Sequence, residues 1–219
     1  MTERPILFSA PMVRAILDGR KTQTRRVVKH PHARDIDAWA WNEARQEWDV
    51  GVYGEGGVLA DMRDGMRCHY GQPGDLLWVR ESFVYRHKHN RYYYRADHEK
   101  FDPYAHNGWK PSIFMPRLAS RITLEVTGVR VQRLHAITEE DAQAEGARRF
   151  DGLPSTHPYG LDARWSMETP ESTRECLGTA RLAFGNLWNR LNGQGAWEAN
   201  PWVWVVEFRK VALRDNGND

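Results

Sequence analysis

The stretch ILFSAPMVRAILDGRKTQTRRVV, residues 6–28, contains the signals of a strand, a helix and a second strand in direct succession. Residues 6–8 form a short apolar run that is typical of a buried strand. Ser9 is a preferred N-cap residue, a proline follows in the first helical turn, and apolar residues recur at helical spacing until Gly19. Residues 21–28 then have threonine and valine in a pattern that favours an exposed strand. The stretch predicts a protein with both α and β structure.

Basic residues are concentrated in the same part of the chain. Between positions 14 and 34 there are seven arginines and lysines and a single acidic residue, Asp18, whereas the whole chain has a net charge of only +2. Such a patch attracts phosphate or another anion. The alternative is a solvated basic surface, which is the commoner fate of a run of charge.

The bulk composition excludes several classes of protein. Of the 219 residues, 41% are hydrophobic and 27% are charged, and no stretch approaches the roughly 18 consecutive apolar residues that span a bilayer. The first residues lack the apolar core of a signal peptide. Two cysteines cannot form a disulfide framework, so we expect free thiols, a cytoplasmic location and no membrane partner.

The rest of the chain consists of short apolar segments separated by turn residues. The expected elements are a hairpin within 38–52, a core strand at 76–79, a hairpin within 83–95, strands at 122–126 and 129–131, a short helix at 138–145, a longer helix at 171–191 and a strand at 202–211. Many short strands, two or three helices and no alternation of strand and helix predict an α+β fold built on a small mixed β-barrel.

The order of four motifs resembles the ASCH family, which has a PUA-like β-barrel fold. The motifs are ILDGRKTQTRR at 16–26, GDLL at 74–77, TEEDAQAE at 138–145 and VWVVEF at 203–208. The sequence is also similar to uncharacterised ASCH-type proteins of phages and prophages. The resemblance implies one domain over residues 1–213 with insertions at about 30–72 and 83–116, and we expect a disordered tail at 214–219.

Within this family the basic segment is most similar to that of the bacterial 4-acetylcytidine amidohydrolases. These enzymes use a lysine, a threonine three residues later and a glutamate on the following helix, so the resemblance implies Lys21, Thr24 and Glu145 as catalytic residues. It implies an acylated cytosine nucleoside or a related modified nucleobase as substrate, without cofactor or metal. The residues expected to bind this substrate are Arg20, Thr22, Arg25 and Arg26. Two alternatives are a non-catalytic RNA-binding module and a ribonuclease acting on single-stranded RNA.

The chemistry of an amide hydrolase places conditions on these residues. A threonine hydroxyl needs a neighbouring base, and a lysine is a base only when burial or nearby cations lower its pKa. In a regular strand, Lys21 and Thr24 lie on opposite faces, so the chain must turn near Gly19 to bring them together. Thr22 is the alternative hydroxyl. Glu145 lies in the last turn of its helix, where the helix dipole disfavours an anion by about 0.3–1 kcal/mol, and it either faces Lys21 or is a surface residue.

Aromatic residues and histidines are the remaining candidates for a site. Most of the ten tryptophans and eight tyrosines are expected in the core, with one exposed aromatic from the insertions reaching the pocket to stack on a base. The candidates are Trp39, Trp41, Tyr53, Trp78, Tyr92, Tyr94 and Trp109. Histidines spaced by two, such as His87 and His89, have a spacing that zinc sites use, but we expect these two at a hairpin tip.

Overall fold

A computed structural model of the 219-residue chain describes residues 1–29, 36–53, 59–98, 108–151, 164–170 and 173–211. For residues 52, 53 and 59–64 the structure describes the backbone only. The expected tail at 214–219 lies outside these ranges.

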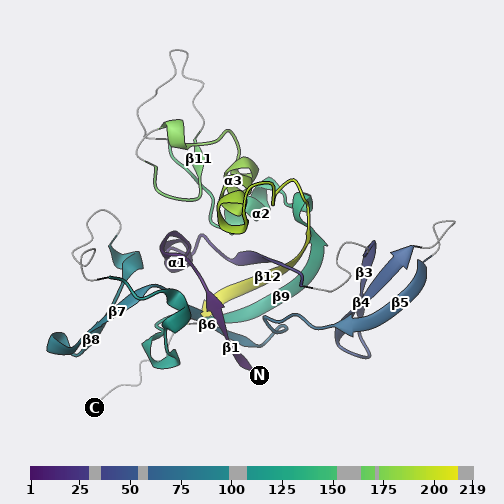
Figure 1. The fold of residues 1–219 in the computed structure, drawn as a ribbon, viewed down its shortest axis with the longest axis horizontal. Coiled ribbons are helices and arrows are strands. Elements are labelled where there is room, and N and C mark those ends of the chain that lie inside the picture. Colours follow the sequence, from purple (N-terminus) through teal and green to yellow (C-terminus); the bar gives the residue numbers. More distant parts are fainter. Residues whose placement is uncertain (30–35, 54–58, 99–107, 152–163, 171–172, 212–219) are drawn as a thin grey trace.

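The expected α+β class is confirmed by a five-stranded sheet and three α-helices (Figure 1). The strand order is β1-β6-β9-β12-β2; β1 runs parallel to β6, and the other neighbours are antiparallel. The strands are β1 (Glu3–Leu7), β2 (Gln23–Val27), β6 (Leu76–Arg80), β9 (Thr123–Arg133) and β12 (Trp202–Val211). The helices are α1 (Ala10–Leu17), α2 (Glu139–Ala144) and α3 (Ala180–Asn192).

The five strands do not close into the expected barrel. In the described ranges β1 and β2 occupy opposite edges of the sheet and do not pair with each other, so the sheet is open. The prediction of two separate strands around Gly128 is also wrong, because β9 runs continuously through this glycine. Gly128 pairs with Glu207 and Val126 with Phe208, so Thr127 is the extra residue of a bulge in β9, which bends the pair of strands without ending either one.

The two predicted insertions contribute smaller β-structures at opposite ends of the molecule (Figure 1). The first contains a three-stranded sheet of β3 (Ala38–Asn42), β4 (Glu47–Tyr53) and β5 (Leu59–Met66); the sequence analysis predicted the hairpin of β3 and β4 but not the third strand. The second contains the hairpin of β7 (Phe83–Arg86) and β8 (Arg91–Tyr94), with both histidines in its tip as predicted. The other short elements are β10 (Arg148–Arg149), β11 (Trp165–Ser166), and 3-10 turns at His87–His89, Arg95–Asp97, Ser112–Phe114, Arg117–Ala119, Leu134–Ala136 and Thr173–Glu175.

The first helix and its ends agree with the sequence prediction. Ser9 occupies the N-cap position of α1, a proline lies in the first turn, and Gly19 has a φ of +74°, a conformation that favours glycine. The strand β2 begins at Gln23 rather than Lys21, and its first three residues are buried rather than exposed. Gln23 and Arg25 are buried because α2 packs against this face of the edge strand through Asp141.

The two later helices differ in how well the sequence marks their start. Thr138 caps α2 through a capping box with Asp141, as its hydroxyl type and spacing predict. The expected helix over 171–191 begins only at Ala180, because Thr179 is the N-cap and its hydroxyl accepts the N–H of Leu182. Leu177 instead forms a bridge with β11.

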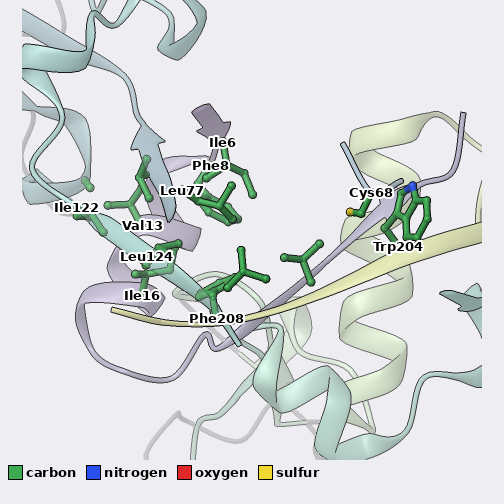
Figure 2. Packing of buried hydrophobic residues seen from close by; sticks show 14 of the residues in the cluster. Ile6, Phe8, Val13, Ile16, Cys68, Leu77, Ile122, Leu124, Trp204 and Phe208 are labelled. Atoms are coloured by element: carbon green, nitrogen blue, oxygen red, sulfur yellow. The ribbon is translucent and has the colours of Figure 1, made fainter. Parts of the chain in front are cut away.

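Strand β12 lies between two hydrophobic clusters. Its residues Trp204, Val206 and Phe208 pack into the larger cluster together with α1 and β1 (Figure 2). The intervening Val203 and Val205 pack into a second cluster with α3. Burial on both faces explains the uninterrupted apolar run of this strand. None of the helices in the described ranges is long and apolar enough to cross a bilayer.

Candidate functional site

The turn that the sequence required before Thr24 is present at the end of α1. The N–H groups of Arg20 and Lys21 both donate to the carbonyl oxygen of Ala15 at 2.9 Å. These bonds reverse the chain around Gly19, so Lys21 precedes β2 instead of belonging to it. Because Lys21 lies outside the strand, the alternation of side chains along β2 does not set the direction of its side chain, which reaches the end of α2.

Lys21 and Glu145 meet in the interior of the protein. The Lys21 side chain has no exposed surface, and its Nζ donates to Oε2 of Glu145 at 2.8 Å, to the backbone carbonyl of Glu145 at 2.8 Å and to that of Gln23 at 2.9 Å. Glu145 is the C-cap of α2 and is also buried. The expectation that it faces Lys21 is thus confirmed, and all three ammonium hydrogens have acceptors.

The close approach of the two segments depends on Gly146. Its φ is +110°, and a Cβ atom at this position would lie 3.2 Å from Cβ of Ala15 and 3.6 Å from Cβ of Lys21. Glycine therefore supplies both the backbone conformation and the space that bring the end of α2 against the end of α1.

Arg25 extends the ion pair into a buried network. Its Nη1 donates to Oε1 of Glu145 at 3.1 Å and its Nη2 to Oδ2 of Asp141 at 2.7 Å. Oδ1 of Asp141 accepts from Nε2 of Gln23 at 3.0 Å and from Nη2 of Arg130 at 3.1 Å. The sequence analysis did not identify Gln23, Asp141 or Arg130; the alternation of Gln23 and Arg25 on one strand face was the available signal.

Thr24 faces the opposite side of β2, away from this network. It shares a face with Arg26 by alternation, and the Arg26 guanidinium lies 5.3 Å from the centroid of the Phe8 ring. The Lys21 ammonium lies 5.6 Å from the same ring. The Thr24 hydroxyl is buried and finds no hydrogen-bond partner in the part of the chain that is described. Lys21 and Arg26 therefore lie around one ring, and none of the three hydrogen bonds of the Lys21 ammonium goes to Thr24.

The other predicted substrate-binding residues have structural contacts. Arg20 forms an ion pair with Asp18 at 2.9 Å and donates to the carbonyl of Gly146 at 3.0 Å. Arg26 donates to the carbonyl of Leu7 at 2.9 Å, and the side chain of Thr22 is exposed. Arg25 is fully buried in the network with Glu145. Of the four predicted substrate-binding residues, only Arg20 lines the pocket next to the site.

This pocket has a volume of about 60 Å³ and lies between α1, Gly146 and β11. Arg14, Arg20 and Arg148 line it, together with Phe150 as its aromatic residue. Ligand pockets usually measure about 300–1,000 Å³, so this one holds no more than part of a nucleoside. The expected aromatic from the insertions is not among its lining residues.

Burial is the main influence on the protonation of Lys21. The loss of hydration lowers its pKa below the ordinary value, the Glu145 carboxylate raises it, and the charges of Arg26 and Arg25 lower it again; the balance is a lowered pKa. This is the direction that a lysine base requires, and two of the predicted arginines contribute to it.

The lowered pKa predicts a specific pH dependence of stability. Between the folded-state pKa of Lys21 and its unfolded value near 10.5, the unfolded chain binds more protons, so the free energy of unfolding rises with pH by at most about 1.4 kcal/mol per unit. We expect this rise in the wild type relative to Lys21→Met, measured by urea unfolding at pH 7 to 10.5. Subtraction of the variant removes the contributions of other groups. A difference that is flat or falls with pH contradicts the prediction.

In the described ranges, no group of three or more histidine, cysteine or acidic residues is arranged to hold a metal ion. Comparisons of the chain with family models, with curated proteins and with solved structures each found no match.

Proposed function

We propose that this protein is a hydrolase of amidohydrolase type that acts on an acylated cytosine nucleoside or a related modified nucleobase in the cytoplasm. Its catalytic residues are Lys21, Thr24 and Glu145. The observation that carries the proposal is the buried contact of 2.8 Å between Lys21 and Glu145, two residues 124 positions apart. In this proposal the chain is an ASCH protein, and its open sheet is a variant of the PUA-like barrel.

The arrangement supports the following chemistry. Lys21 passes a proton to Glu145 and becomes the base for the Thr24 hydroxyl, whose oxygen attacks the acyl carbon of the substrate. The amide C–N bond breaks, the exocyclic nitrogen of the base takes the proton from Lys21, and the acyl group remains on Thr24 as an ester. Glu145 then returns its proton to Lys21 and, as a carboxylate, takes a proton from a water molecule whose oxygen attacks the ester; the ester C–O bond breaks and the Thr24 oxygen takes this proton back. The products are the free base amine and a carboxylic acid.

Two features of Thr24 favour it as the nucleophile. Its hydroxyl is buried without a hydrogen-bond partner among the described residues. Such burial lowers the stability of the folded protein by about 1–3 kcal/mol, and a role as nucleophile explains why the hydroxyl is present. The Gln23 carbonyl that accepts from Lys21 directly precedes Thr24 in the chain, so Lys21 contacts the backbone next to Thr24, and the reaction requires the ammonium to leave this carbonyl for the hydroxyl on the other face of β2.

The second candidate function belongs to another class. Arg14, Arg20 and Arg148 line the pocket next to the site, and such a group of cations favours RNA phosphate. A non-catalytic RNA-binding module or a ribonuclease on single-stranded RNA would use them, with Lys21 as a structural residue.

The sharpest test of the catalytic proposal is Thr24→Val. Valine has the shape of threonine and removes only a hydroxyl that makes no hydrogen bond, so we expect an unchanged or slightly higher stability. With 4-acetylcytidine as substrate and chromatographic detection of cytidine, we expect activity to fall at least about 100-fold. We expect the same loss in Lys21→Ala.

The control is Gln143→Ala, an exposed change on α2 that should retain wild-type activity. Labelled single-stranded RNA is incubated in parallel. If the wild type does not hydrolyse 4-acetylcytidine but binds RNA with an affinity that falls as salt increases, the enzymatic proposal is contradicted and the binding module is supported. Shortening of the RNA supports the ribonuclease.

A further inference from the structure

A larger pocket lies against the first insertion, apart from the Lys21 site. It has a volume of about 700 Å³, which is within the usual range for ligand sites. Its walls are the start of the chain and β1, the hairpin of β3 and β4, the segment 67–75, and Val129 of β9. None of the residues predicted for the Lys21 site lines it.

The pocket results from the way in which the inserted sheet packs on the main sheet. Trp39 and Trp48 contact Trp204 of β12 edge to face, with ring centroids 5.9 and 6.3 Å apart. Cys68, which also lines the pocket, lies beside Trp204 at the same end of the core cluster (Figure 2). The inserted sheet is therefore fixed through Trp39 and Trp48, and the pocket extends beyond these contacts.

Trp41 is the aromatic residue that this packing leaves uncovered. It lies two residues after Trp39 on the same face of β3 and opposite Trp48 in the hairpin, and its ring centroid is 5.4 Å from that of Trp48. Trp41 is 40% exposed and lines the pocket. A tryptophan held by a second ring, with part of its surface open, is a suitable platform for a planar ligand.

Arg4 supplies an unpartnered cation in the same pocket. Its Nε is buried, and no described residue accepts a hydrogen bond from this side chain. The nearby carboxylate of Asp75 is already engaged, because it accepts the N–H of Thr2 at 2.7 Å and that of Gln72 at 3.3 Å. Arg4 is half-buried, and a buried N–H without an acceptor is costly. An arginine guanidinium binds phosphate through two parallel hydrogen bonds.

The rim of the pocket adds a second cation and neutral hydrogen-bonding groups. The Arg67 side chain is 73% exposed, and its Nε lies 4.0 Å from a carboxylate oxygen of Glu47. An exposed ion pair at this distance contributes little to stability. Gln46 and Gln72 present amide groups that donate and accept hydrogen bonds.

We propose that this pocket is a nucleotide-binding site, in which the base stacks on Trp41 and the phosphate binds Arg4. An apolar ligand would leave the Arg4 charge unpaired, and a simple anion would leave Trp41 unused. The same chemistry is offered by a free nucleoside monophosphate and by one nucleotide of a single-stranded RNA. The site is separate from Lys21, so it does not depend on whether the protein is a hydrolase.

The test is isothermal titration calorimetry of the full chain with cytidine 5′-monophosphate, cytidine, inorganic phosphate and a short single-stranded oligouridylate. We expect the monophosphate to bind and Trp41→Ala to weaken its affinity by about 5- to 100-fold. Arg4→Gln should weaken the affinity for the monophosphate by a similar factor and leave the affinity for cytidine nearly unchanged. Trp41→Phe retains a ring and should retain most of the affinity.

Trp78→Ala is the matched control, because it removes a partly exposed indole that lies outside the pocket. Equal affinities for the monophosphate and the oligouridylate, both dependent on Trp41, indicate a free nucleotide; a much higher affinity for the oligouridylate indicates RNA. Absence of binding at millimolar monophosphate overturns the proposal. So does binding that survives in both Trp41→Ala and Arg4→Gln but is lost in Lys21→Ala, because the ligand then occupies the Lys21 site.

Discussion

Glu145→Ala is expected to lower the free energy of unfolding by about 3–5 kcal/mol, because it leaves two buried cations without their shared carboxylate. The side chains of Lys21 and Arg25 have no exposed surface, so water cannot replace the lost acceptor. Arg25 retains Asp141, and Lys21 retains two backbone carbonyls. These remaining contacts do not neutralise both charges.

The size of this loss should depend on pH in one direction. Without Glu145, the largest influence that raises the pKa of Lys21 is absent, so its pKa falls further. Lys21 can then lose its proton at moderately alkaline pH, whereas Arg25 cannot. We expect the difference from the wild type, measured by urea unfolding and circular dichroism, to shrink as pH increases. Gln143→Ala on the same helix should change stability by less than about 0.5 kcal/mol. Equal losses in the two variants would show that the buried network contributes nothing.

The sequence alone predicted the features that depend on residues close to one another in the chain. The first helix with Ser9 and Gly19, and the second with Thr138, form where their caps predict, since capping depends on neighbouring groups. The longer helix was placed nine residues too early. Apolar spacing from Leu177 onward resembles a helix, but the residues before Thr179 bond to β11 instead, which is a tertiary contact.

The candidate site was predicted in part for a similar reason. The turn at Gly19 follows from the residue type, whereas the pairing of Lys21 with Glu145 was implied only by the resemblance to a family, since position alone left Glu145 as a possible surface residue. Arg25 and Asp141 were not predicted to join them, because their contact depends on α2 lying across the edge strand β2. The open sheet was also unpredictable from strand patterns, since closure depends on whether the two edge strands meet.

The interpretation of Trp41 changed most between sequence and structure. The sequence indicated that an exposed aromatic from the insertions reaches the catalytic pocket. Trp41 is exposed, but it lines the separate pocket below the inserted sheet. Alternation places Trp39 and Trp41 on one face of a strand, but it cannot indicate which of them the main sheet covers. That depends on the contact with Trp204, more than 160 positions later in the chain.

Trp204→Ala is therefore expected to affect stability and ligand binding together. Trp204 is 3% exposed and contacts both Trp39 and Trp48, so its removal leaves a large cavity and should cost about 3–5 kcal/mol of unfolding free energy. It should also weaken cytidine 5′-monophosphate binding at least about 10-fold, although Trp204 does not line the pocket, because the inserted sheet loses the contact that positions Trp41.

Trp188→Ala separates these two effects. Trp188 is buried to a similar degree, but it is a residue of α3 and belongs to the second cluster, on the other side of β12. We expect a comparable loss of stability, measured by urea unfolding, and an unchanged affinity for the monophosphate, measured by calorimetry at a temperature where both variants are folded. If both variants lose affinity equally, binding follows overall stability. If neither does, the inserted sheet keeps its position without Trp204, and the pocket must be maintained by Trp39, Trp48 and the segment 67–75.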